Sequence, residues 1–190
     1  MTMVMDANKA VSSLIESRRI LVLGSSGSGK SRFSTRLGRV LGIQPVHLDA
    51  YFWRPGWVAT PADEWNDIVT ELIAEDSWIM DGTYERTLPL RIPSAEILIV
   101  IDSCRLACLG RILWRKMTDD GPTRTDAPPS QPIDWGYIGY IWQYPSRTRL
   151  VVQECIQECG RENRVVRLEG PRGANLLLER LEDHLGLSKR

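Results

Sequence analysis

The chain has 190 residues, of which 43% are hydrophobic, and its 24 lysines and arginines are balanced by 24 aspartates and glutamates. This length and apolar content suit one hydrophobic core, so we expect residues 1–190 to form a single domain. The zero net charge disfavours a dedicated duplex-DNA binder but does not exclude nucleic-acid binding. No apolar run approaches the roughly 18 residues of a membrane span and the N-terminus lacks a signal-peptide core, which predicts no membrane association and a cytoplasmic location.

The first predicted elements are an amphipathic helix over residues 6–18 and a buried, apolar strand over residues 19–23. The next eight residues fit the P-loop pattern G-x-x-x-x-G-K-[ST] at every fixed position. Residues 32–41 follow with apolar side chains at helical spacing. A glycine loop between a strand and a helix is the context that this motif requires, so the stretch predicts a nucleoside triphosphate site and not a chance match in a flexible linker.

Each residue type in the loop has a physical reason. Glycines let successive backbone N–H groups point inward at an anion, and the following helix N-terminus adds its unpaired donors and positive dipole end. Lys30 is expected to reach the β- and γ-phosphates as a catalytic residue, and the Ser31 hydroxyl is expected to bind Mg²⁺. The expected ATP-binding residues are Gly24, Ser25, Ser26, Gly27, Ser28, Gly29, Lys30, Ser31 and Arg32.

A second strand is predicted over residues 45–49, ending in Asp49. The aromatic and basic residues 51–57 show no period and predict a loop. Its rings either form a small packed cluster or stack on a planar ligand, with Arg54 on the phosphate of that ligand. Thr60 is the expected N-cap of the next helix. We therefore expect acceptor binding at residues 50–75, with substrate contacts from Asp49, Trp53 and Arg54.

Two near-continuous apolar runs predict buried parallel strands over residues 77–81 and 95–102. The first ends in Asp81 and the second in Asp102, and either carboxylate could hold a metal. We favour Asp81 as the magnesium ligand because the following Gly82 would let a ligand approach closely.

The rest of the chain predicts a helix over residues 104–117, a fifth strand over 164–168 and a closing helix over 174–185. Residues 117–135 lack an apolar period and predict a mobile lid that carries Arg124. Two helices separated at Pro145 are expected between residues 135 and 159.

The four cysteines form two i, i+4 pairs, Cys104 with Cys108 and Cys155 with Cys159. This spacing is wider than that of common zinc knuckles, so we favour reduced, packed thiols over a metal site.

The alternation of strands and helices predicts an α/β fold with a parallel sheet and right-handed crossovers. Ligands bind at the carboxyl ends of the strands in such sheets, which is where the P-loop and the strand-end carboxylates are expected.

Beyond the P-loop, four stretches carry a family resemblance: residues 47–57, 81–84, 86–88 and 142–147. The chain resembles adenylate-kinase-like P-loop proteins of the FlaR-related branch, often labelled "DNA topology modulation protein", over roughly residues 19–150. The resemblance implies a nucleoside-kinase-like fold with five parallel strands in the order 2-3-1-4-5, helices on both faces, and ATP with magnesium. It also implies that Asp81 holds Mg²⁺ through water, that Arg86 binds the acceptor phosphate, and that Arg111 and Arg115 grip the triphosphate.

The favoured function is an ATP-dependent phosphotransferase whose small acceptor is a nucleotide or nucleoside-like molecule. An acceptor phosphate needs only arginine clamps, whereas an alcohol needs its proton accepted, and Asp49 suits either a base or an orienting hydrogen bond. The alternative is an ATP-binding regulator that acts on DNA or a protein partner without turnover. A GTPase is disfavoured because the sequence holds no Asn-Lys-x-Asp motif. The oligomeric state stays open.

Overall fold

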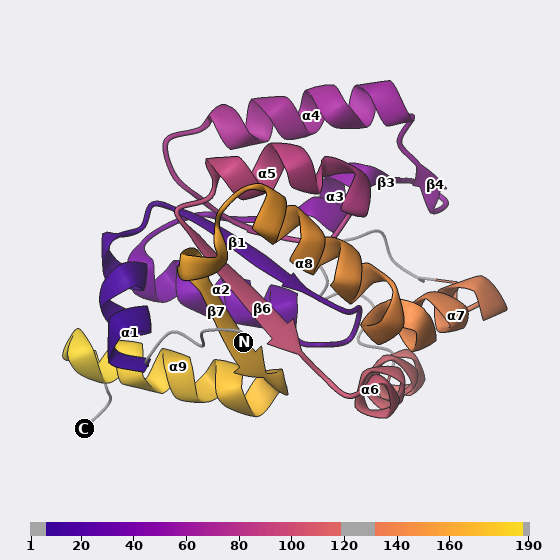
Figure 1. Ribbon diagram of the computed structural model, residues 1–190. Helices are drawn as coiled ribbons and strands as arrows, with labels where there is room; N and C mark the ends of the chain where they lie inside the picture. The colour runs from indigo at the N-terminus through magenta and orange to yellow at the C-terminus, as the bar shows by residue number, and fades with distance from the viewer. Residues whose placement is uncertain (1–6, 119–131, 188–190) are drawn as a thin grey trace.

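The computed structural model describes residues 7–118 and 132–187, and it is built around a five-stranded parallel sheet (Figure 1). In spatial order the strands are β2 (Pro45–His47), β5 (Trp78–Asp81), β1 (Arg19–Gly24), β6 (Ile97–Asp102) and β7 (Val165–Glu169). Numbered along the chain, these five strands run 2-3-1-4-5. The expected fold class and strand order are therefore confirmed.

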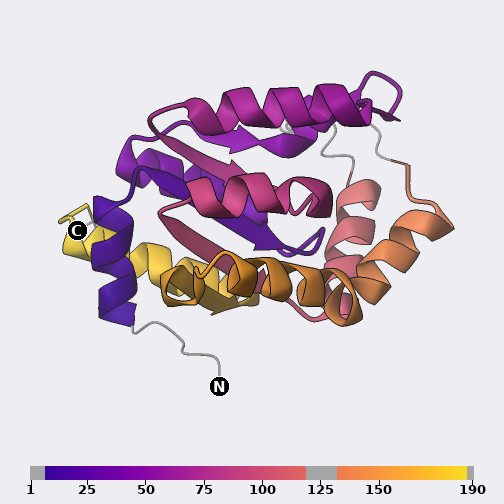
Figure 2. The ribbon, with the colours of Figure 1, turned by 45° about the horizontal axis from the view of Figure 1, so that its top comes forward.

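Helices cover both faces of the sheet (Figure 1). One face carries α1 (Ala7–Glu16), α2 (Lys30–Leu41) and α9 (Gly170–His184). The other face carries α4 (Ala62–Ala74), α5 (Leu88–Ser94) and α8 (Thr148–Glu158). Two further helices, α6 (Arg105–Met117) and α7 (Trp135–Gln143), lie next to each other beyond the carboxyl ends of the strands (Figure 2).

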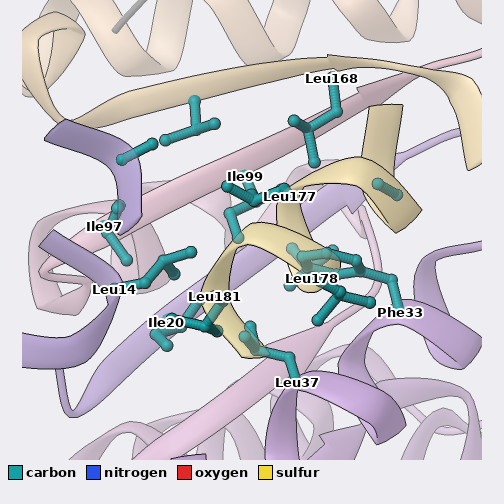
Figure 3. Close-up of a cluster of buried hydrophobic side chains, with 14 of the residues drawn as sticks. Leu14, Ile20, Phe33, Leu37, Ile97, Ile99, Leu168, Leu177, Leu178 and Leu181 are labelled. Carbon is teal, nitrogen blue, oxygen red and sulfur yellow. The ribbon is translucent and has the colours of Figure 1, made fainter. Parts of the chain in front are cut away.

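The alternation of side chains along β1 links the two layers. Ile20 and Val22 pack into a cluster with α1, α2 and α9 (Figure 3), and Leu21 and Leu23 pack into the cluster below α4, α5 and α8. All four side chains are fully buried. Burying each such side chain contributes about 1.5–3 kcal/mol, so the central strand is anchored from both faces, and the P-loop that follows it starts from a fixed point.

Two details after β2 differ from the sequence-based expectation. The strand ends at His47, and Asp49 lies in the first turn of the short helix α3 (Leu48–Phe52) and not at a strand end. The aromatic segment is not a plain loop, because it contains α3 and a small antiparallel ladder of β3 (Trp53–Arg54) with β4 (Val58–Ala59). Ring contacts of Phe52 with Trp65 and Tyr84, at centroid distances of 5.0 and 4.6 Å, stabilise this structure.

Thr60 was expected to cap α4, but its hydroxyl donates instead to the carbonyl oxygens of Tyr51 and Phe52 at 3.2 and 2.8 Å. Pro61 occupies the N-cap position of α4. The helix α5 and the 3₁₀ helix η1 (Glu85–Thr87) were not anticipated between β5 and β6. The break at Pro145 is confirmed, because the 3₁₀ helix η3 (Tyr144–Ser146) separates α7 from α8. A further 3₁₀ helix, η4 (Glu162–Arg164), precedes β7.

Within residues 7–118 and 132–187, each helix is too short or too polar to cross a lipid bilayer. The four cysteines are free thiols. Cys108 is buried and Cys155 and Cys159 are half-buried, but Cys104 is exposed, so the expectation of packed thiols fails for Cys104.

Candidate active site

The glycines of the P-loop adopt backbone conformations that residues with a Cβ rarely take. Gly24, Gly27 and Gly29 have φ values of 151°, 75° and 97°. A Cβ would lie 2.6 Å from the Ile101 carbonyl oxygen at Gly24 and 2.7 Å from the Cys108 carbonyl oxygen at Gly27. The loop therefore accommodates only glycine at these places, and it leads directly into the N-terminus of α2. This geometry fits a cradle for phosphate groups.

Lys30 begins α2, and its side chain folds back over the loop, where Nζ donates to the Ser25 carbonyl oxygen at 2.9 Å. Lys30 and Ser31 both line a cleft of about 530 Å³ that opens at the carboxyl ends of the strands. From the same loop and helix, the cleft is also lined by Ser26, Gly27, Gly29 and Arg32.

Asp81 and not Asp102 faces this loop. The Ser31 hydroxyl donates to Asp81 Oδ1 at 3.1 Å, and Asp81 lines the cleft at the end of β5. Asp102 ends β6 outside the cleft lining and forms ion pairs with Arg149 and Arg167 at 3.8 and 3.7 Å. Because Mg²⁺ prefers oxygen ligands, the pair of Ser31 and Asp81 fits that ion.

The described residues contain no group of three or more His, Cys, Asp or Glu side chains that could hold a metal alone. An ion at Ser31 and Asp81 would take its remaining ligands from phosphate oxygens and water, as Mg²⁺ commonly does in sites of phosphoryl transfer.

Asp49 lies on the opposite wall of the cleft, where the Tyr84 hydroxyl donates to its Oδ1 at 2.5 Å. Burial, and next the charge of Asp49, raise the pKa of the Tyr84 phenol well above its ordinary value, so this hydroxyl stays protonated. Tyr84 has an unusual positive φ of 33°. The ring of Trp53 lines the same wall.

A buried arginine shapes the turn that carries Tyr84. Arg91, on α5, is fully buried and donates to the carbonyl oxygens of Gly82, Thr83 and Tyr84 at 2.8, 2.5 and 2.9 Å. The Thr83 hydroxyl in turn donates to the Gly24 carbonyl oxygen at 2.9 Å. These bonds connect the turn after β5 to the start of the P-loop.

Helices α6 and α7 close the third side of the cleft. Arg111 and Arg115 line it from α6, and Arg111 Nε donates to the Gly27 carbonyl oxygen at 2.6 Å. From α7, the Tyr137 hydroxyl forms a hydrogen bond with the Ser26 hydroxyl, and Tyr140 lines the cleft beside it. Of the two arginines expected near the triphosphate, Arg111 contacts the P-loop and Arg115 lines the same cleft, and their role at a triphosphate stays a prediction.

The structure does not bring every expected residue to the cleft. Arg54 is exposed and pairs with Glu64, and Arg86 is exposed on η1; neither lines the cleft. Arg124 and most of the expected lid lie in residues 119–131, outside the described part of the chain.

Several residues that line the cleft are not marked by the sequence, namely Tyr84, Glu85, Tyr137 and Tyr140. No periodic or motif signal marked these side chains, although Tyr84 belongs to a stretch that carried the family resemblance.

A scan of the sequence against protein-family models gives no match, and a search among curated proteins finds no relative. Solved structures do match. Shikimate kinase from Acinetobacter baumannii, solved with shikimate, aligns with a TM-score of 0.57 and 12% identity over 95% of this chain and 99% of its own. Shikimate kinase from Bacteroides thetaiotaomicron aligns with a TM-score of 0.51 and 11% identity over 90% of this chain and 99% of its own. At such identities the likeness concerns the fold alone, and the fold of this chain is similar to that of these two kinases.

Proposed function

We propose that this protein is an ATP-dependent phosphotransferase that moves the γ-phosphoryl group of ATP to a small acceptor. The observation that carries the proposal is a convergence of side chains from separate elements on one cleft. Lys30 and Ser31 come from the P-loop helix, Asp81 from the end of β5, and Asp49 from α3. A phosphate cradle, a metal ligand pair and a carboxylate are thereby placed around one space.

The roles follow from what phosphoryl transfer requires, which is positioning and neutralisation of charge. The backbone amides of residues 24–29 and the N-terminus of α2 hold the phosphates, and Lys30, Arg111 and Arg115 offset the charge that develops on the transferred group. Ser31 and Asp81 would hold Mg²⁺, which would supply charge neutralisation at the phosphates. Asp49 contacts the acceptor, and Trp53 forms the wall beside it.

The finer identity is also part of this proposal. The stretches at residues 47–57 and 81–84 support membership of the FlaR-related branch of adenylate-kinase-like proteins. The structure positions Asp49, Trp53 and Tyr84 of these stretches around the same wall of the cleft, which supports a shared acceptor role for them.

The test is transfer of label from γ-labelled ATP with Mg²⁺ to a panel of nucleotides, nucleosides, sugars and small alcohols. We expect one acceptor class to become labelled, and Lys30→Ala to lower the rate by about 10²–10³. Lys9→Ala is the matched control, because Lys9 is exposed on α1 and does not line the cleft. Binding of ATP without labelling of any acceptor, together with salt-sensitive retention on DNA, would favour a regulatory protein instead.

A further inference from the structure

We infer that the acceptor is an uncharged or cationic compound that reacts through a hydroxyl group, and that it is not a phosphate monoester or another anion. The inference rests on the proposed function and specifies its substrate class. It follows from the uneven distribution of charge between the two ends of the cleft.

The positive charge lies at the P-loop end. Within the described residues, the cations that line the cleft are Lys30 and Arg32 on α2 and Arg111 and Arg115 on α6. Lys30 contacts the P-loop carbonyl of Ser25, and Arg111 contacts that of Gly27. These side chains surround the place where a triphosphate belongs.

The arginines near the acceptor end are directed elsewhere. Arg54 forms an ion pair with Glu64, Arg86 is exposed outside the cleft, and Arg91 is buried behind the turn with its guanidinium hydrogen-bonded to backbone carbonyls. An acceptor phosphate is normally bound by arginine forks, and the described walls contributed by α3, β3 and the turn after β5 supply none.

The acceptor end instead carries carboxylates and rings. Asp49 and Glu85 line it together with Trp53, Tyr84 and Tyr140. Burial, and next Tyr144, raise the pKa of the Tyr140 phenol, and the nearby charges of Glu85 and Asp49 raise it further. A phosphate brought here would meet two like charges, whereas a neutral ligand would stack on the rings and a cation would gain cation–π and ionic attraction.

Asp49 gives this end a chemical role that only a hydroxyl acceptor needs. The acceptor oxygen forms a bond to the γ-phosphorus, and the bond from that phosphorus to the β–γ bridging oxygen breaks, with its electron pair leaving on ADP. The hydroxyl proton passes to the carboxylate of Asp49. A carboxylate accepts several hydrogen bonds, so Asp49 can accept the bond from the Tyr84 hydroxyl that orients it and still accept one from an acceptor hydroxyl.

The experiment measures transfer from γ-labelled ATP to matched compounds: adenosine against AMP, glycerol against glycerol 3-phosphate, and choline against glycerate. We expect label on adenosine, glycerol or choline and none on their anionic counterparts. Label on AMP, glycerol 3-phosphate or glycerate would overturn the inference while upholding the phosphotransferase. Absence of label throughout, with ATP still bound, would overturn both.

Variants separate the role of charge from a structural role. Asp49→Asn preserves shape and is expected to lower kcat by about 10²–10⁴ with little change in the KM for ATP. Glu85→Gln is expected to raise the KM for choline and to relieve exclusion of glycerate. Because Glu85 also accepts a hydrogen bond from Thr148, Thr148→Val is the matched control that loses this bond and keeps the charge. If Glu85→Gln and Thr148→Val changed acceptor selectivity equally, the role of the Glu85 charge would be overturned. A large increase in the KM for the labelled acceptor in Arg86→Ala would overturn the inference as a whole.

Discussion

His47 Nδ1 and Asp81 Oδ2 lie 2.5 Å apart at the neighbouring ends of β2 and β5. An ionised carboxylate can only accept, so the imidazole donates through Nδ1, and the opposite ring nitrogen lies 3.4 Å from the Thr35 hydroxyl. Asp81 is thereby held from one side by His47 and from the other by Ser31. His47 is a positioning residue for the proposed magnesium ligand.

Replacement of His47 by Ala is expected to raise the Mg²⁺ concentration needed for half-maximal turnover by about 10- to 100-fold, because the carboxylate loses the partner that orients it. Titration of Mg²⁺ at saturating ATP measures the effect. Thr35→Val is the control, since it removes the contact to the imidazole and the hydroxyl's bond to the Ser31 carbonyl oxygen but leaves the bond between His47 and Asp81, and it should shift the titration much less. An unchanged Mg²⁺ requirement in His47→Ala would contradict the positioning role.

Arg91→Met is expected to lower the free energy of unfolding by about 3 kcal/mol or more. The apolar side chain fills much of the space but leaves several buried carbonyl oxygens without donors, and each costs on the order of 1–3 kcal/mol. Denaturant unfolding measures this change. Arg86→Met on the exposed side of the same segment should stay within about 0.5 kcal/mol of the parent protein.

Gly27→Ala is expected to lower ATP affinity by more than about tenfold, since the added Cβ would meet the Cys108 carbonyl oxygen at 2.7 Å and the Ile112 side chain at 3.1 Å. Calorimetric titration with ATP gives the affinity. Gly110→Ala is the matched control on α6, where a Cβ meets nothing within 4 Å, and it should stabilise the helix by up to about 1 kcal/mol. Equal ATP affinity in the two variants would argue against a tightly packed P-loop.

Cys104 precedes α6, and hydrogen bonds from the backbone N–H groups of Ala107 and Leu106 lower the pKa of its thiol. A lowered pKa increases the thiolate fraction at neutral pH, so Cys104 should be alkylated by iodoacetamide with a midpoint below that of an ordinary cysteine. Burial raises the pKa of Cys155, which should react only at higher pH. Mass spectrometry of the modified peptides at a series of pH values tests both. Faster alkylation of Cys155 at neutral pH would refute this assignment.

The sheet could be predicted because its determinants are local. Continuous apolar runs mark the buried strands β5 and β6, and the glycine pattern before Lys30 specifies the turn between β1 and α2. The structure separates the two carboxylates, because Asp81 lines the cleft whereas Arg149 and Arg167 engage Asp102 outside it, and the magnesium role of Asp81 stays a prediction.

The wall of the cleft formed by Asp49, Trp53 and Tyr84 could not be predicted, because its contacts join residues far apart in the chain. Tyr84 reaches Asp49 across 35 positions, and no spacing rule encodes that pair. The sequence also gives no sign that Arg91 is a buried hydrogen-bond donor, because an arginine between two strands is ordinarily solvent-exposed. Asp49 was placed at a strand end because the five-residue helix α3 is too short to show a period.

The bond from Thr83 to Gly24 and the three carbonyl bonds of Arg91 tie the turn after β5 to the start of the P-loop. Tyr84, which donates a hydrogen bond to Asp49, and Gly24, which begins the P-loop, therefore belong to one hydrogen-bonded unit. For the proposed transfer, the separation between the attacking oxygen and the phosphorus would then be set largely by the fold, so that little orientational entropy would remain to be lost when both reactants bind.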